Sequence, residues 1–145
     1  MQTALTPLAS THLYKRDGTL APFDAAALVL WANADHWAKL CFEHSPQGQA
    51  MVVSVVTNGH SDDCNAEVVN GPFVYLRISR VGPAWAFHSS ADGGTWTFVR
   101  LFRLTTDEPV HIGFMSQAPL GNHCVSSFEA IKFTLTAPAD LRDGS

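Results

Sequence analysis

The stretch from Phe73 to Arg80, FVYLRISR, decides the fold class of this chain. Toward its end, apolar Leu76 and Ile78 alternate with polar Arg77 and Ser79. Successive side chains of a β-strand point to opposite faces of its sheet, so this alternation is typical of a strand with one face in the core and one in solvent. We therefore predict that the stretch is a strand of an antiparallel sheet.

Similar short runs, rich in β-branched and aromatic residues, recur along the chain at 26–33, 37–44, 51–57, 85–89, 95–104, 110–117 and 124–135. Clusters that favour turns separate them, among them Asn58-Gly59 and Asp92-Gly93-Gly94. Turn signals at spacings near ten residues indicate antiparallel sheets and argue against alternating strands and helices. The sequence thus predicts an all-β, antiparallel two-sheet β-sandwich.

The composition narrows the class of protein. A chain of 145 residues matches one domain, and its charged fraction of 15% lies below the usual share of about 25%, which argues against disorder. The net charge is −4 and the nine Lys and Arg residues are scattered, so we expect no nucleic-acid partner. No stretch approaches the roughly 18 apolar residues of a membrane span and no signal peptide is recognisable, so we expect no membrane partner and a cytoplasmic protein.

The cysteines and histidines form no recognisable metal or disulfide pattern. Cys41, Cys64 and Cys124 are odd in number and contain no CxxC pair, and we expect Cys41 and Cys124 to be small core residues. The seven histidines show no HxH or HExxH spacing, although His60 stands near two aspartates. No nucleophile elbow or phosphate loop is present. We predict no metal, no cofactor and no catalytic residue.

Three segments are expected along the chain. Residues 1–22 have little periodicity and predict an N-terminal arm or a marginal strand. Residues 23–136 carry the predicted strands and form the β-sandwich domain. Residues 137–145 are polar and contain Pro138 and Gly144, so we predict a flexible tail.

Several segments together resemble the DUF1349 family, namely 23–30, 37–43, 55–63, 76–82, 90–96 and 113–119. The resemblance implies a concanavalin A-like jelly-roll sandwich and a family that includes an enolase-regulating yeast protein. Members usually carry more residues ahead of the segment at Phe23, so the resemblance implies a sandwich whose early strands are either missing or replaced at the N-terminus. An open sheet edge invites pairing with another chain, and we expect a homodimer through that edge.

One predicted strand face carries residues suited to a sugar. In the run 37–44, Trp37, Lys39, Cys41 and Glu43 share a face because side chains alternate along a strand. An aromatic ring beside a base and an acid suits a sugar, whose C–H groups pack on the ring while its hydroxyls meet the polar rim. The alternative is that Lys39 and Glu43 form an exposed pair of little energetic weight, with the core supplied by the opposite face.

A polar cluster at residues 57–65 is the second candidate, with Thr57, His60, Asp62 and Asp63 as ligand-binding residues. Its carboxylates and amides match sugar hydroxyls. The alternative is a hairpin turn at Asn58-Gly59 with the nearby polar side chains bonded to backbone amides.

Two further features have mainly structural interpretations. Arg77 is a candidate ligand contact, but an ion pair of Arg77 or Arg80 with Glu43 or Asp62 is the favoured alternative. The segment 90–96 is close to an Asp-box turn, in which Ser and Asp bond backbone amides above a tryptophan, and a structural role is favoured.

Three functions remain open from the sequence. We favour a non-catalytic carbohydrate-binding-like module, on the resemblance and on the Trp37 face. The alternative is a protein-interaction or regulatory domain, in line with the enolase-regulating relative. A glycoside hydrolase ranks third, because retaining chemistry needs two carboxylates about 5–5.5 Å apart and no E-x-D-x-x-E string is present.

Overall fold

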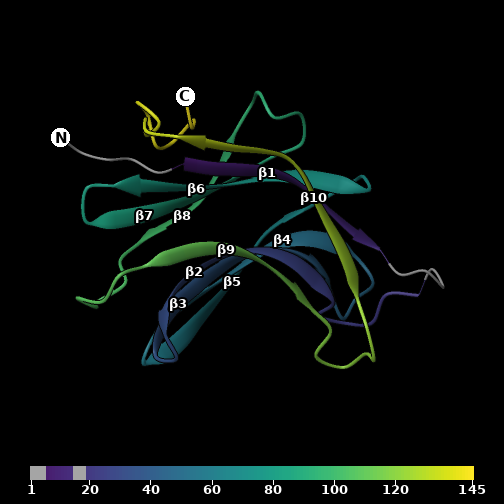
Figure 1. The fold of residues 1–145 in the computed structure, drawn as a ribbon. Helices are drawn as coiled ribbons and strands as arrows, with labels where there is room; N and C mark the ends of the chain where they lie inside the picture. The colour runs from purple at the N-terminus through teal and green to yellow at the C-terminus, as the bar shows by residue number, and fades with distance from the viewer. Residues whose placement is uncertain (1–5, 15–18) are drawn as a thin grey trace.

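The computed structural model describes residues 6–14 and 19–145, and within them the secondary structure is entirely β-strand and loop. Ten strands form two five-stranded antiparallel sheets packed face to face (Figure 1). The strands are β1 (Thr6–Tyr14), β2 (Ala25–Asn33), β3 (His36–His44), β4 (Ala50–Asn58), β5 (His60–Val68), β6 (Phe73–Val81), β7 (Ala84–Ser90), β8 (Thr97–Phe102), β9 (His111–Gln117) and β10 (Val125–Thr134). The predicted all-β two-sheet sandwich is confirmed.

The strands are not in chain order within either sheet. The first sheet has the order β10-β1-β6-β7-β8, and the second has the order β5-β4-β3-β2-β9. β1 falls in the segment expected to be an arm or a marginal strand, yet it pairs with β10 on one side and β6 on the other. The sheet edges are therefore β10, β8, β5 and β9, and homodimerisation through one of them stays a prediction.

The core lies between the sheets and is built by the predicted alternation. Leu28 and Leu40 from the second sheet and Leu76, Ile78 and Phe87 from the first are fully buried in one cluster. Each such side chain contributes about 1.5–3 kcal/mol when it is removed from water. This apolar layer holds the two sheets together and leaves their outer faces for other roles.

The outer face of the second sheet has an unusual floor. Ala25, Ala27, Cys41 and Val53 point away from the main core and are nevertheless almost completely buried. Figure 1 shows the strands of this sheet arching, with the hollow side turned away from the first sheet. The partly buried side chains of Val29, Met51 and Met115 pack against these small residues and shield them from water.

The segment predicted to be a flexible tail makes defined contacts. It lies on the outer face of the first sheet, where the Gly144 carbonyl accepts a hydrogen bond of 2.7 Å from Arg77 Nη2 and the Leu141 carbonyl lies 2.8 Å from His88 Nε2. Buried polar side chains require partners, and these backbone carbonyls supply them. Gly144 has φ +72°, and a Cβ there would collide with Arg77 and Trp96, so glycine is required.

Candidate functional site

The outer face of the second sheet carries two tryptophans side by side. Trp31 of β2 lies directly opposite Trp37 of β3, because the hairpin turns at Ala34-Asp35. Asn33 Oδ1 fixes this turn by accepting a hydrogen bond of 3.0 Å from the Asp35 amide. The Trp37 indole N–H donates to the Ala34 carbonyl at 3.2 Å, and Trp31 is 47% exposed. One indole is thus anchored while its neighbour is open to solvent.

A fixed cation lies next to this pair. Lys39, two residues along β3 from Trp37, donates from Nζ to Gln117 Oε1 at 2.7 Å, and its ammonium lies 6.0 Å from the Trp37 ring centroid. Gln117 in turn donates from Nε2 to the Phe23 carbonyl at 2.8 Å. The chain of hydrogen bonds orients a donor and an amide on the same face as the aromatic rings.

The acidic end of the face is nearly dry. Glu43 is 8% exposed, and burial raises its pKa above the ordinary value; nearby Lys39 opposes this shift and Asp63 adds to it. Burial also raises the pKa of the Cys41 thiol to about 12, so Cys41 is a packing residue and no nucleophile at neutral pH. A neutral hydrogen-bonding partner would therefore stabilise the nearly buried carboxyl group of Glu43.

We call the outer surface formed by Trp31, Trp37, Lys39, Glu43 and Gln117 the tryptophan face. A hollow of about 310 Å³ adjoins it, lined by Val29, Trp31, His111, Ile112, Gly113, Phe114 and Met115. At Gly113 nothing lies within 4 Å of the position that a Cβ would take, so the absent side chain keeps the hollow open. Its volume is at the lower end of the range of small-molecule sites.

Five of the predicted site residues share this side of the second sheet: Trp37, Lys39, Glu43, Thr57 and Asp63. Thr57 is 5% exposed and its hydroxyl lies 2.7 Å from that of Ser61. The remaining three lie elsewhere. His60 and Asp62 alternate to the opposite side of β5, and Arg77 belongs to the first sheet.

This placement bears on two interpretations of the sequence. Residues 57–65 lie in the hairpin of β4 and β5, which turns at Gly59 with φ +75°, so the hairpin turn expected at Asn58-Gly59 is observed. The ion pair suggested for Arg77 with Glu43 or Asp62 is wrong, because Arg77 alternates with the core residues Leu76 and Ile78 and so lies on the outer face of the first sheet, away from the second sheet. Arg77 instead stacks on Trp96 at 4.1 Å, and Arg80 lies over Trp85 at 5.5 Å.

Sequence reasoning missed Trp31, His111 and Gln117. A signal for Trp31 was present, since a turn centred on Ala34-Asp35 places it opposite Trp37. Gln117 had no such signal, because it follows Lys39 by 78 residues and meets it only through the pairing of β2 with β9.

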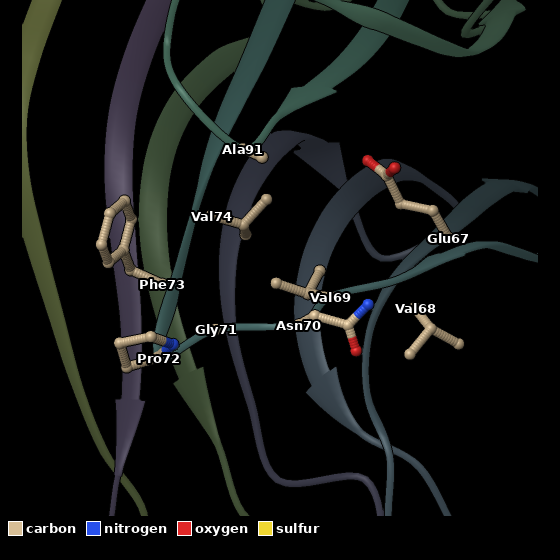
Figure 2. Close-up of a pocket in the computed structure, with 9 residues that line it drawn as sticks. All are labelled: Glu67, Val68, Val69, Asn70, Gly71, Pro72, Phe73, Val74 and Ala91. Carbon is tan, nitrogen blue, oxygen red and sulfur yellow. The ribbon is translucent and has the colours of Figure 1, made fainter.

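A second hollow, of about 340 Å³, lies where the chain passes from β5 to β6, and Figure 2 shows the residues that line it. Glu67 is the one acidic residue among those that line it. Its carboxylate accepts a hydrogen bond from the buried Ser89 hydroxyl, which joins β5 to β7. A lone carboxylate engaged in this way gives a structural link between the sheets and not the pair that glycoside hydrolysis needs.

No metal cluster appears in the described parts of the chain: residues 6–14 and 19–145 contain no group of three His, Cys, Asp or Glu side chains placed to hold an ion. Over the same residues, no helix has the length and apolar character needed to cross a membrane.

Comparison with known protein families matches residues 16–136 to DUF1349, which is described as a protein of unknown function. This chain belongs to the DUF1349 family. The resemblance inferred from the sequence is therefore confirmed. Among curated proteins, this DUF1349 chain is 32% identical over 117 residues to "Regulation of enolase protein 1" of Saccharomyces cerevisiae, a match that covers 80% of the chain and 58% of the yeast protein. The chain thus spans less than two thirds of that relative.

Solved structures support the fold of this DUF1349 domain. A functionally unknown protein from Saccharomyces cerevisiae superposes with a TM-score of 0.79 at 27% identity, over 94% of this chain and 71% of that one. A xylan β-1,4-xylosidase from Bacillus halodurans C-125 superposes with a TM-score of 0.75 at 14% identity, over 90% of this chain and 27% of the enzyme. At this identity the second likeness shows the jelly-roll sandwich alone.

Proposed function

We propose that the tryptophan face binds carbohydrate without catalysing a reaction. The observation that carries the proposal is the adjacent pair Trp31 and Trp37 beside the hydrogen-bonded Lys39 and Gln117. Aromatic rings pack against the C–H groups of a sugar ring, and fixed amide and ammonium groups match its hydroxyls. Prior fixing of these polar groups lowers the entropy cost of binding.

The rest of the face suits the same ligand. Ala25, Ala27 and Cys41 form a buried apolar layer beneath the face, which gives its aromatic and polar residues a rigid support. Glu43, whose raised pKa reflects its burial, gains a partner when a hydroxyl donates to it. The hollow over Gly113 extends the face beyond Trp31 and offers room for a second sugar unit.

The names of similar proteins point in two directions. One protein with a similar fold is named a xylan β-1,4-xylosidase, so a domain of this shape occurs within an enzyme that acts on a glycan. The name of the yeast relative favours the alternative, a protein-interaction or regulatory domain. The cytoplasmic location predicted from the sequence remains part of the proposal.

A glycan-array screen followed by titration tests the proposal. We expect the purified chain to bind at least one glycan, and Trp31→Ala to weaken binding at least tenfold, which corresponds to about 1.4 kcal/mol. Gly113→Val should weaken binding of longer glycans by filling the hollow. Leu101→Ala is the control, because Leu101 is 51% exposed and lies on β8 of the other sheet.

Melting temperatures of all variants would establish that each is folded. Absence of binding by the wild-type chain across the array would overturn the proposal and favour the regulatory alternative. Binding that is equal in wild type and Trp31→Ala would also overturn it, because the tryptophan pair would then be irrelevant.

A further inference from the structure

A separate site lies on the outer face of the first sheet, on the opposite side of the molecule from the tryptophan face. Its centre is Arg77 of β6, which is 9% exposed. The guanidinium lies 4.1 Å from the Trp96 ring centroid, and its Nη2 donates to the Gly144 carbonyl at 2.7 Å. Its Nε is buried and has no hydrogen-bond partner among the described residues.

This cation has no side-chain carboxylate as a partner in the part of the chain that the structure describes. Burial lowers the pKa of Arg77 to about 10, and no ion pair between Arg77 and a carboxylate is found within residues 6–14 and 19–145. The Ser145 oxygen nearby accepts from the backbone amides of Ala139 and Asp140 instead. A buried charge without a counter-charge is costly, so the site gains when an anion arrives.

The surroundings of Arg77 form a pocket. It has a volume of about 270 Å³, and its lining includes Arg77, Trp96, Lys132 and the loop residues Ala137 and Pro138. No acidic side chain is among its described lining residues, which also include Gly144 and Ser145. Lys132 adds a second positive charge at the rim, because it is exposed on the edge strand β10.

We propose that this pocket binds a small oxyanion, a carboxylate or phosphate group, between Arg77 and Lys132. The planar guanidinium presents several N–H donors in a rigid fork that matches such groups, and stacking on Trp96 keeps the fork in one orientation. Bonds from a charged donor to a charged acceptor are about twice as strong as neutral ones. The small volume suits a single anionic group or a small acid. This site is independent of the proposed carbohydrate site.

NMR titration of the ¹⁵N-labelled full chain with sodium acetate, and separately with sodium phosphate, tests the proposal. Sodium chloride keeps the ionic strength constant. We expect saturable shifts of the Arg77 Nε–H and Trp96 indole N–H signals with at least one anion. The anion that binds more tightly shows whether the pocket prefers a planar carboxylate or a tetrahedral phosphate. The apparent Kd should rise at least tenfold in Arg77→Lys and at least threefold in Lys132→Gln.

Arg103→Gln is the matched control, because it removes one positive charge from an exposed position on another part of the surface and should leave the Kd unchanged. Should Arg77→Lys fail to fold, Lys132→Gln decides, since Lys132 is exposed. The proposal is overturned when neither anion gives a saturable shift, or when Arg103→Gln weakens binding as much as Lys132→Gln.

Discussion

At the scale of single residues, the burial of Glu43 on the tryptophan face has a cost in stability. Its carboxyl is nearly buried, and its folded-state pKa lies above the ordinary value because burial penalises the charged form. Raised carboxyl pKa values mean that the folded state binds the proton more tightly than the unfolded state. The contribution of Glu43 to the free energy of unfolding is therefore fully present below the pKa of its unfolded state. It is lost as the pH rises through the pKa of its folded state.

This linkage predicts that Glu43→Gln raises the melting temperature at pH 7, because the amide keeps the shape of the side chain without its charge. At pH 4 the difference between variant and wild type should shrink. Calorimetry at both pH values measures this, with exposed Glu129→Gln as the control. A variant that is less stable than wild type by the same amount at both pH values would show that hydrogen bonding, and not charge, dominates at Glu43.

At the scale of elements, the turn between β7 and β8 is held by side-chain hydrogen bonds to backbone amides, as the resemblance of 90–96 to an Asp-box turn predicted. We call this turn the staple. Asp92 Oδ1 accepts hydrogen bonds from the amides of Thr95 at 2.7 Å and Gly94 at 2.8 Å, and Ser90 Oγ donates to it at 3.0 Å. These bonds favour the ionised carboxylate, and they lower the pKa of Asp92 from 3.8 to about 2.

The staple makes a pH-dependent contribution of known sign. A depressed carboxyl pKa stabilises the fold above the unfolded value of 3.8, and the contribution is lost as the pH falls toward 2. We expect Asp92→Asn to be less stable than wild type in urea at pH 6 and to approach it at pH 2. NMR should give a titration midpoint for Asp92 near 2. A midpoint at the ordinary value would show that the staple does not form in solution.

Elements whose pattern is local were predictable, and those defined by distant partners were not. Alternation in β3 correctly placed Trp37, Lys39 and Glu43 on one face. β5 was interpreted as a loop because it is an edge strand with no apolar side to its pattern. The sequence predicted at most a marginal strand in the region of β1, because the position of β1 inside the sheet depends on β6 and β10, which come much later in the chain. The same reason hides the contact between Lys39 and Gln117.

At the scale of the whole molecule, the two sheets separate two proposed sites. The tryptophan face presents aromatic rings and neutral donors, whereas the Arg77 pocket presents positive charge on the far side of the core. The core makes each site depend on the integrity of both sheets, because residues of β2, β3 and β4 pack against those of β6 and β7. The strand that joins β6 to β10 therefore matters for both sites.

Thr11 in β1 tests this dependence. Thr11 is fully buried and pairs with Val74 of β6 and Phe128 of β10. Proline at this inner position removes a ladder donor and leaves buried backbone groups unpaired, at a cost of about 1–3 kcal/mol for each group. We expect Thr11→Pro to lower the free energy of unfolding in urea by at least about 2 kcal/mol. Thr11→Ser, the control, should stay closer to wild type. Wild-type stability in Thr11→Pro would mean that the segment is a dispensable arm, which is one of the two alternatives that the sequence left open.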